Sequence, residues 1–136
     1  MLLATVLLFA VGSATDNLMT YWLVVVRGDF CEANPFVASF VYSQPLYMWF
    51  VRDFVFLALT IAISLGCKRL ILWLSRSDPP SRRAGIAKMA FRHWIIVLTV
   101  AVARLLPAIH NVLLVATGYE SPLPLIYNYT YNLLGG

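Results

Sequence analysis

The long apolar runs of this chain set the strongest limit on what it can fold into. Three of them, at about residues 2–26, 46–67 and 93–117, are long enough to cross a hydrocarbon core of about 30 Å as α-helices. Of the 136 residues, 61% are hydrophobic and 12% are charged, whereas about a quarter of the residues of a soluble domain are charged. We therefore expect an all-α integral membrane protein in which three transmembrane helices form a single domain, residues 1–136.

The first apolar run contains a polar interruption at Thr15, Asp16 and Asn17. The small residues just before it, at positions 12–14, resemble the cleavage site of a secretory signal peptide. A signal peptide would also carry a positively charged segment ahead of the apolar one, and this chain has none there. An uncleaved transmembrane helix with a polar position near its middle is the better interpretation.

Residues 27–45, between the first two runs, contain Gly28, Pro35 and Pro45, which favour the end of one helix and the start of another. The apolar segment that follows Pro35 is too short to span a membrane. Proline is well tolerated in the first turn of a helix. The pattern predicts a short helix after Pro35, either interfacial or re-entrant.

Charge predicts the orientation of the chain. Residues 68–92 contain seven basic residues and one acidic residue, Asp78, and positively charged loops stay in the cytoplasm. We therefore expect this basic loop and the N-terminus to be cytoplasmic, in the cell membrane. The loop that contains Asp29 and Glu32, and the tail of residues 118–136, should lie outside.

The net charge of +4 does not indicate a nucleic-acid partner, because the basic residues form no face interleaved with stacking aromatic residues. Most of them belong to residues 68–92, where they could also contact anionic lipid headgroups. The expected partners are therefore the lipid bilayer and, at the basic loop, anionic lipids.

Charged residues inside the apolar runs need partners, because a charge at the bilayer centre costs at least about 2.5 kcal/mol. At about 1.5 Å of rise per residue, Asp16 and Arg104 both reach the membrane midplane, and we expect them to pair. By the same count Arg52 and Asp53 lie at about the depth of His110 and Asn111. These four residues should form a second polar layer, nearer the outside.

Helical spacing places Arg104 and Asn111 on one face of the third span, and Asp16 and Thr20 on one face of the first. Glu32 and Asn34 could cover this polar layer from the outer loop. The pattern predicts a polar notch that opens to the outside. Its candidate ligand residues are Asp16, Thr20, Glu32, Asn34, Asp53, Arg104, His110 and Asn111.

Motifs of known enzymes give little support for catalysis. The chain has no HExxH or GxSxG motif. His93 and His110 are 17 positions apart, or about 25 Å along a helix, so they cannot both be axial ligands of one haem. We assign no catalytic residue and no cofactor, and the sequence does not specify a metal.

Asp16-Asn-Leu-Met-Thr20, Gly28 and Glu32-Ala-Asn-Pro35 together resemble a signature of small prokaryotic integral membrane domains of unknown function. The pattern of that family is Asp…Thr…Gly…Glu-x-Asn-Pro, and it covers the first third of the chain. The resemblance implies a short bundle of helices and draws attention to Asp16, Thr20, Glu32 and Asn34. It implies no reaction.

Three functions are compatible with this pattern. The polar notch could bind or conduct an ion or a small polar solute. The same charges could instead attach an accessory subunit to a larger membrane complex, or belong to an intramembrane metal-assisted hydrolase. Three helices enclose little interior, and the buried charges need more surroundings than one protomer offers, so we expect a homo-oligomer or a partner membrane subunit.

Overall fold

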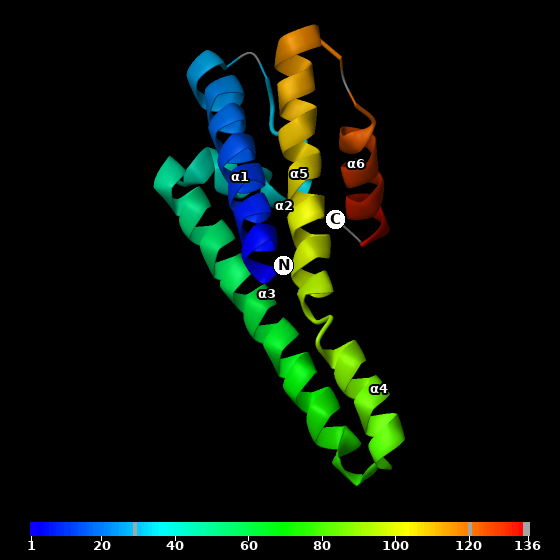
Figure 1. The fold of residues 1–136 in the computed structure, drawn as a ribbon. Helices are drawn as coiled ribbons and strands as arrows, with labels where there is room; N and C mark the ends of the chain where they lie inside the picture. The colour runs from blue at the N-terminus through cyan, green and yellow to red at the C-terminus, as the bar shows by residue number, and fades with distance from the viewer. Residues whose placement is uncertain (29, 120, 135–136) are drawn as a thin grey trace.

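The computed structural model describes residues 1–28, 30–119 and 121–134, and this part of the chain contains helices and no strand. Figure 1 shows their arrangement. In chain order the elements are α1 (Leu2–Thr20), the π-helix η1 (Tyr21–Arg27), α2 (Pro35–Ser43), α3 (Leu46–Leu74), the 3₁₀ turn η2 (Ser75–Ser77), α4 (Pro80–Ala90), α5 (Trp94–Thr117) and α6 (Leu123–Leu133).

Three continuous helical stretches are long and apolar enough to cross a membrane, namely Leu2–Arg27, Leu46–Ser77 and Pro80–Thr117. The predicted fold class is therefore confirmed: the chain is all-α, with three candidate spans and additional shorter helices. These properties are compatible with a multi-pass membrane protein.

The basic stretch of residues 68–92 is mostly helical. α3 continues through it to Leu74, and α4 returns from Pro80 after a short turn, so the two form a helical hairpin that projects from one end of the bundle (Figure 1). No proline interrupts α3 before this turn, and Pro80 occupies the first turn of α4, where proline is tolerated.

The core of the bundle lies where α1, α3 and α5 meet. Phe9, Leu57, Val97 and Ala101 are buried together there. Gly12 allows α1 to approach α5 closely, since an added Cβ would lie 3.1 Å from Leu105 Cδ2 and 3.3 Å from the backbone oxygen of Arg104. Close approach at small residues is a common way for helices to pack in membranes.

The two short helices α2 and α6 lie beside the bundle (Figure 1). Asn34 caps α2 by accepting a hydrogen bond from the Phe36 N–H, and Pro35 is in the first turn, as expected for a helix that begins there. The tail also forms a helix, α6, which runs back along α5. An edge-to-face contact between Phe36 and Tyr131 joins the two short helices.

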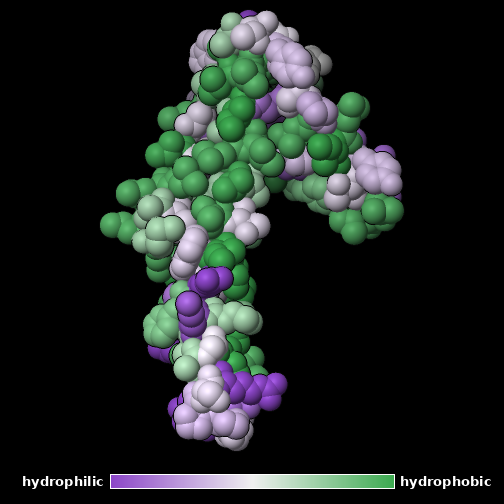
Figure 2. Space-filling view, turned by 45° about the vertical axis from the view of Figure 1, so that its right-hand side comes forward, coloured by the Kyte–Doolittle hydropathy of each residue, from purple (hydrophilic) through white to green (hydrophobic). Residues whose placement is uncertain are grey.

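Apolar side chains cover much of the outer surface of the bundle, whereas hydrophilic residues gather on the α3–α4 hairpin (Figure 2). Large residues such as Leu3, Phe54 and Ile63 are more than half exposed. A soluble monomer rarely exposes so much contiguous apolar surface. This distribution is the one expected for helices that are surrounded by lipid.

We predict that Gly12→Leu lowers the free energy of unfolding by about 1–3 kcal/mol, because the new side chain must push α1 away from the α5 backbone. Gly66→Leu is the matched control, since no atom lies within 4 Å of the Cβ that would be added there. Unfolding in mixed detergent micelles measures both variants. Equal stability of the two would contradict the close α1–α5 contact.

Candidate functional site

One face of α1 carries a row of buried polar side chains. Ser13, Asp16, Asn17 and Thr20 recur at spacings of three and four residues, so they lie on the same side of the helix. All four are at most 9% exposed. Buried polar groups of this kind require partners on neighbouring helices.

Arg104 on α5 is the central partner of this row. Its Nη1 lies 2.8 Å from Asp16 Oδ2, as the sequence predicted for this pair. Its Nη2 donates to Asn17 Oδ1 at 3.0 Å and also to Asp53 Oδ2 on α3. A single guanidinium group therefore joins carboxylates from two other helices.

Asp53 is held from three directions. Ser13 Oγ and Asn17 Nδ2 donate to its Oδ2 at 2.6 and 3.0 Å, and Arg52 Nε and Nη2 donate to its Oδ1 at 3.1 and 3.0 Å. Together with Arg104, these bonds satisfy both carboxylate oxygens. They tie α1, α3 and α5 together at one level of the bundle.

The expected second layer of Arg52, Asp53, His110 and Asn111 is divided in the structure. Arg52 and Asp53 belong to the Arg104 cluster. Asn111 donates to Asp16 Oδ1 at 2.9 Å and to Thr20 Oγ1 at 3.0 Å, while His110 Nδ1 lies 2.7 Å from Ser121 Oγ. The estimate from helical rise placed these residues at similar depths, but it could not show in which direction each side chain points from its helix axis.

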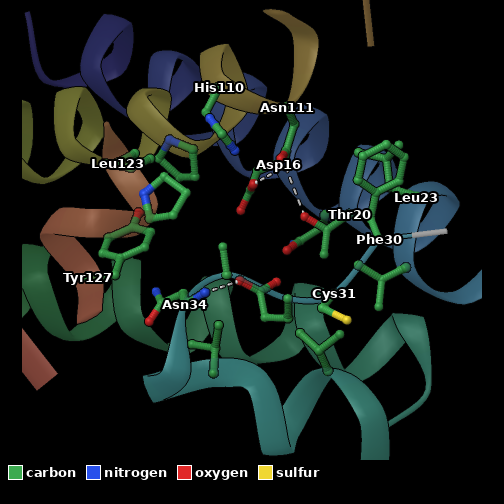
Figure 3. Close-up of a pocket in the computed structure, with 18 of the residues that line it drawn as sticks. Asp16, Thr20, Leu23, Phe30, Cys31, Asn34, His110, Asn111, Leu123 and Tyr127 are labelled. Carbon is green, nitrogen blue, oxygen red and sulfur yellow. Dashed lines mark hydrogen bonds between the residues drawn. The ribbon is translucent and has the colours of Figure 1, made fainter. Parts of the chain in front are cut away.

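A cavity of about 100 Å³ lies against this cluster, between the two short helices and the end of the bundle that is farther from the α3–α4 hairpin. Figure 3 shows Asp16, His110 and Asn111 on one wall, Cys31 and Asn34 opposite, and Tyr127 at one side. Its polar and charged lining residues are Asp16, Asn17, Thr20, Glu32, Asn34, Arg52, Arg104, His110, Asn111 and Tyr127. Seven of the eight predicted ligand residues thus line one cavity, and the eighth, Asp53, lies behind it.

Glu32 reaches the cavity from the segment that precedes α2. One carboxylate oxygen accepts a hydrogen bond from the Asn34 N–H at 2.8 Å. Burial raises the pKa of Glu32 above its ordinary value, the Asn34 N–H opposes this, and the nearby charge of Asp16 adds to it. Glu32 therefore holds a proton more readily than an exposed glutamate does.

The sequence did not indicate three parts of the site. Ser13 resembled part of a signal-peptide cleavage site, although its four-residue spacing to Asn17 could have revealed it. Asn17 stood out only as an interruption of the apolar run. Tyr127 reaches the cavity because α6 folds back along α5, and nothing in the local pattern of the tail predicts that return.

Metal ligands are not clustered in the part of the chain that the structure describes, where no group of three or more His, Cys, Asp or Glu side chains is placed to hold an ion. Asp29, expected in the outer acidic loop, lies outside the described residues.

No protein-family model, curated protein or solved structure matches this chain. The resemblance to small prokaryotic membrane domains therefore stays a prediction from the sequence. The residues that it pointed to, Asp16, Thr20, Glu32 and Asn34, all line the cavity.

We predict that Arg104→Gln costs about 3–5 kcal/mol of unfolding free energy, because it leaves Asp16 and Asp53 buried with an uncompensated charge. Arg69→Gln, at an exposed position of α3, should change little. Adding Asp16→Asn to Arg104→Gln should recover much of the loss, because Asp53 keeps Arg52 as its partner. Unfolding in mixed micelles measures these variants, and no recovery would argue against an electrostatic origin.

Proposed function

We propose that this chain binds, or conducts, a small cation or polar solute in the cavity between α1, α5 and the two short helices. The observation that carries the proposal is the presence of two carboxylates, Asp16 and Glu32, on the lining of one cavity within an apolar bundle. Convergent polar groups in a pocket that is otherwise apolar are typical of small-molecule sites. An ionisable residue inside a membrane protein commonly marks an ion or substrate path.

The charge of the lining favours a positive guest. Asp16, Glu32 and the adjacent Asp53 provide three carboxylates, while Arg52 and Arg104 provide two guanidinium groups that pair with the aspartates. Among the described carboxylates of the lining, Glu32 is the one outside these ion pairs. A cation or a proton would neutralise it at low cost in this weakly solvated environment.

We also propose that the protein lies in the cell membrane with its N-terminus and the α3–α4 hairpin in the cytoplasm and its C-terminus outside. The support is the excess of basic residues on that hairpin. Anionic headgroups of the cytoplasmic leaflet are suitable partners for those side chains. In this orientation the cavity belongs to the outer half of the bundle.

A second candidate function is an accessory subunit, or one protomer of a homo-oligomer, whose charges serve assembly. Arg52 favours it, because its side chain is 30% exposed and its carboxylate partner, Asp53, belongs to the same helix. A second copy or another membrane subunit could cover the exposed part of this side chain. Crosslinking in membranes followed by sizing in lipid nanodiscs separates these states from a monomer.

Flux into proteoliposomes and binding in nanodiscs test the proposed function. We expect at least one member of a panel of small cations and neutral polar solutes to bind or to cross, and Asp16→Asn to reduce that signal about tenfold or more, because a charged partner is removed. Asp78→Asn, an acid on the hairpin far along the chain from the cavity, is the control. Equal signals from wild type, Asp16→Asn and Asp53→Asn would reject the proposal.

Cation binding should weaken as the pH falls. Because the pKa of Glu32 is raised, protons begin to compete above its ordinary value of 4.5, and below that value its carboxylate is largely neutral. The charged groups that act on Glu32 are Asp16, Arg52 and Arg104, with Tyr127 of α6 nearby. Titration of binding against pH should show this loss in wild type. Glu32→Gln should abolish the part of the pH dependence that comes from Glu32. A pH profile that is the same in this variant and in wild type would contradict the role of Glu32.

A further inference from the structure

The lining of the cavity contains two kinds of group, hydrogen-bond acceptors and apolar side chains. Carboxylate oxygens of Asp16 and Glu32, the Thr20 hydroxyl and the Tyr127 hydroxyl all provide hydrogen-bond acceptors. Apolar side chains complete the lining at Leu23, Val24, Val37, Val41, Leu114 and Leu123. An occupant of this cavity therefore meets both hydrogen-bond acceptors and hydrocarbon.

The acceptors do not all come from one element. Asp16 and Thr20 belong to α1, and Figure 3 shows them across the cavity from Asn34, whose N–H bonds the Glu32 carboxylate. Tyr127 approaches from α6. A group with several N–H donors that point in different directions can use all of these acceptors, whereas a single donor cannot.

Aromatic rings in the lining also favour an ammonium group. Phe30, Trp49 and Tyr127 are part of the lining, and the faces of aromatic rings attract ammonium groups. Burial raises the pKa of Tyr127, and the charges of Asp16 and Glu32 raise it further. Its hydroxyl therefore stays protonated at neutral pH and can accept a hydrogen bond as a neutral group.

The charges of the described acidic and basic lining residues favour a guest with a single positive charge. Three carboxylates lie beside two paired guanidinium groups, so a divalent ion would leave a net positive charge in a desolvated site. A monovalent inorganic ion would satisfy the charge but would make no favourable contact with the apolar lining residues. A small organic ammonium ion satisfies both parts of the lining.

We propose that the cavity is a site for a small primary alkylamine in its protonated form. Its ammonium group would lie between Asp16 and Glu32, and its alkyl group would contact the apolar lining residues. This inference rests on the proposed function and narrows it to one class of ligand. A volume of about 100 Å³ limits the guest to a few non-hydrogen atoms. Because Asp16 already pairs with Arg104, Glu32 is the carboxylate that balances the charge of the guest.

Calorimetric binding in nanodiscs of phosphatidylcholine, which carry no net charge, tests the proposal. The probes are propylammonium, tetramethylammonium, 1-propanol and potassium ion. Propylammonium should bind at least about tenfold more tightly than the other three, because only it combines charge, N–H donors and an alkyl group. Glu32→Gln should weaken it by a similar factor, while Asp78→Asn should not.

The outcomes separate this inference from the proposed function. Tighter binding of potassium ion or tetramethylammonium than of propylammonium would overturn the amine assignment and leave the cation site standing. Binding of 1-propanol as tight as that of propylammonium would overturn the role of charge. Failure of all four probes to bind correctly folded wild-type protein would overturn the amine site, and failure of the whole solute panel would overturn the proposed function as well.

Discussion

The contact of one guanidinium group with two carboxylates is the interaction on which the rest of this structure depends. Arg104 on α5 pairs with Asp16 on α1 and Asp53 on α3, and Asn17 accepts a further hydrogen bond from it. Each of these charges alone would oppose burial among apolar helices. Together they compensate one another, so the three helices are fixed in one register where the charges meet.

The position of the cavity follows from this register. Asp16 offers one oxygen to Arg104 and the other to Asn111, and both bonds hold its carboxylate at the edge of an open space. Between this cluster and the α3–α4 hairpin, the bundle is closed by packed apolar residues around Phe9 and Val97. On the other side of the cluster the three helices do not fill the interior, and the segment with Glu32 and the two short helices complete the walls of the cavity. The charged cluster therefore separates a closed half of the bundle from an open half.

The sequence predicted the parts of the fold that depend on membrane thickness. The apolar runs are as long as a bilayer requires, and the depth of Asp16 and Arg104 followed from the rise of a helix, so their pairing could be predicted. The direction in which each side chain points from its helix axis was harder to predict from the sequence. Asp53 was expected near His110, but it faces Ser13 and Asn17. The return of α6 depends on tertiary contacts with the bundle, which local sequence patterns do not encode.

A structure in lipid nanodiscs, at a resolution that shows ordered water and ions, tests the central claim most directly. The account predicts that the Arg104 guanidinium lies between Asp16 and Asp53, and that solvent or ligand density occupies the space between Asp16 and Glu32. A site in which side chains close that space and Glu32 faces away from Asp16 would contradict it. In that case the charges would serve helix packing alone.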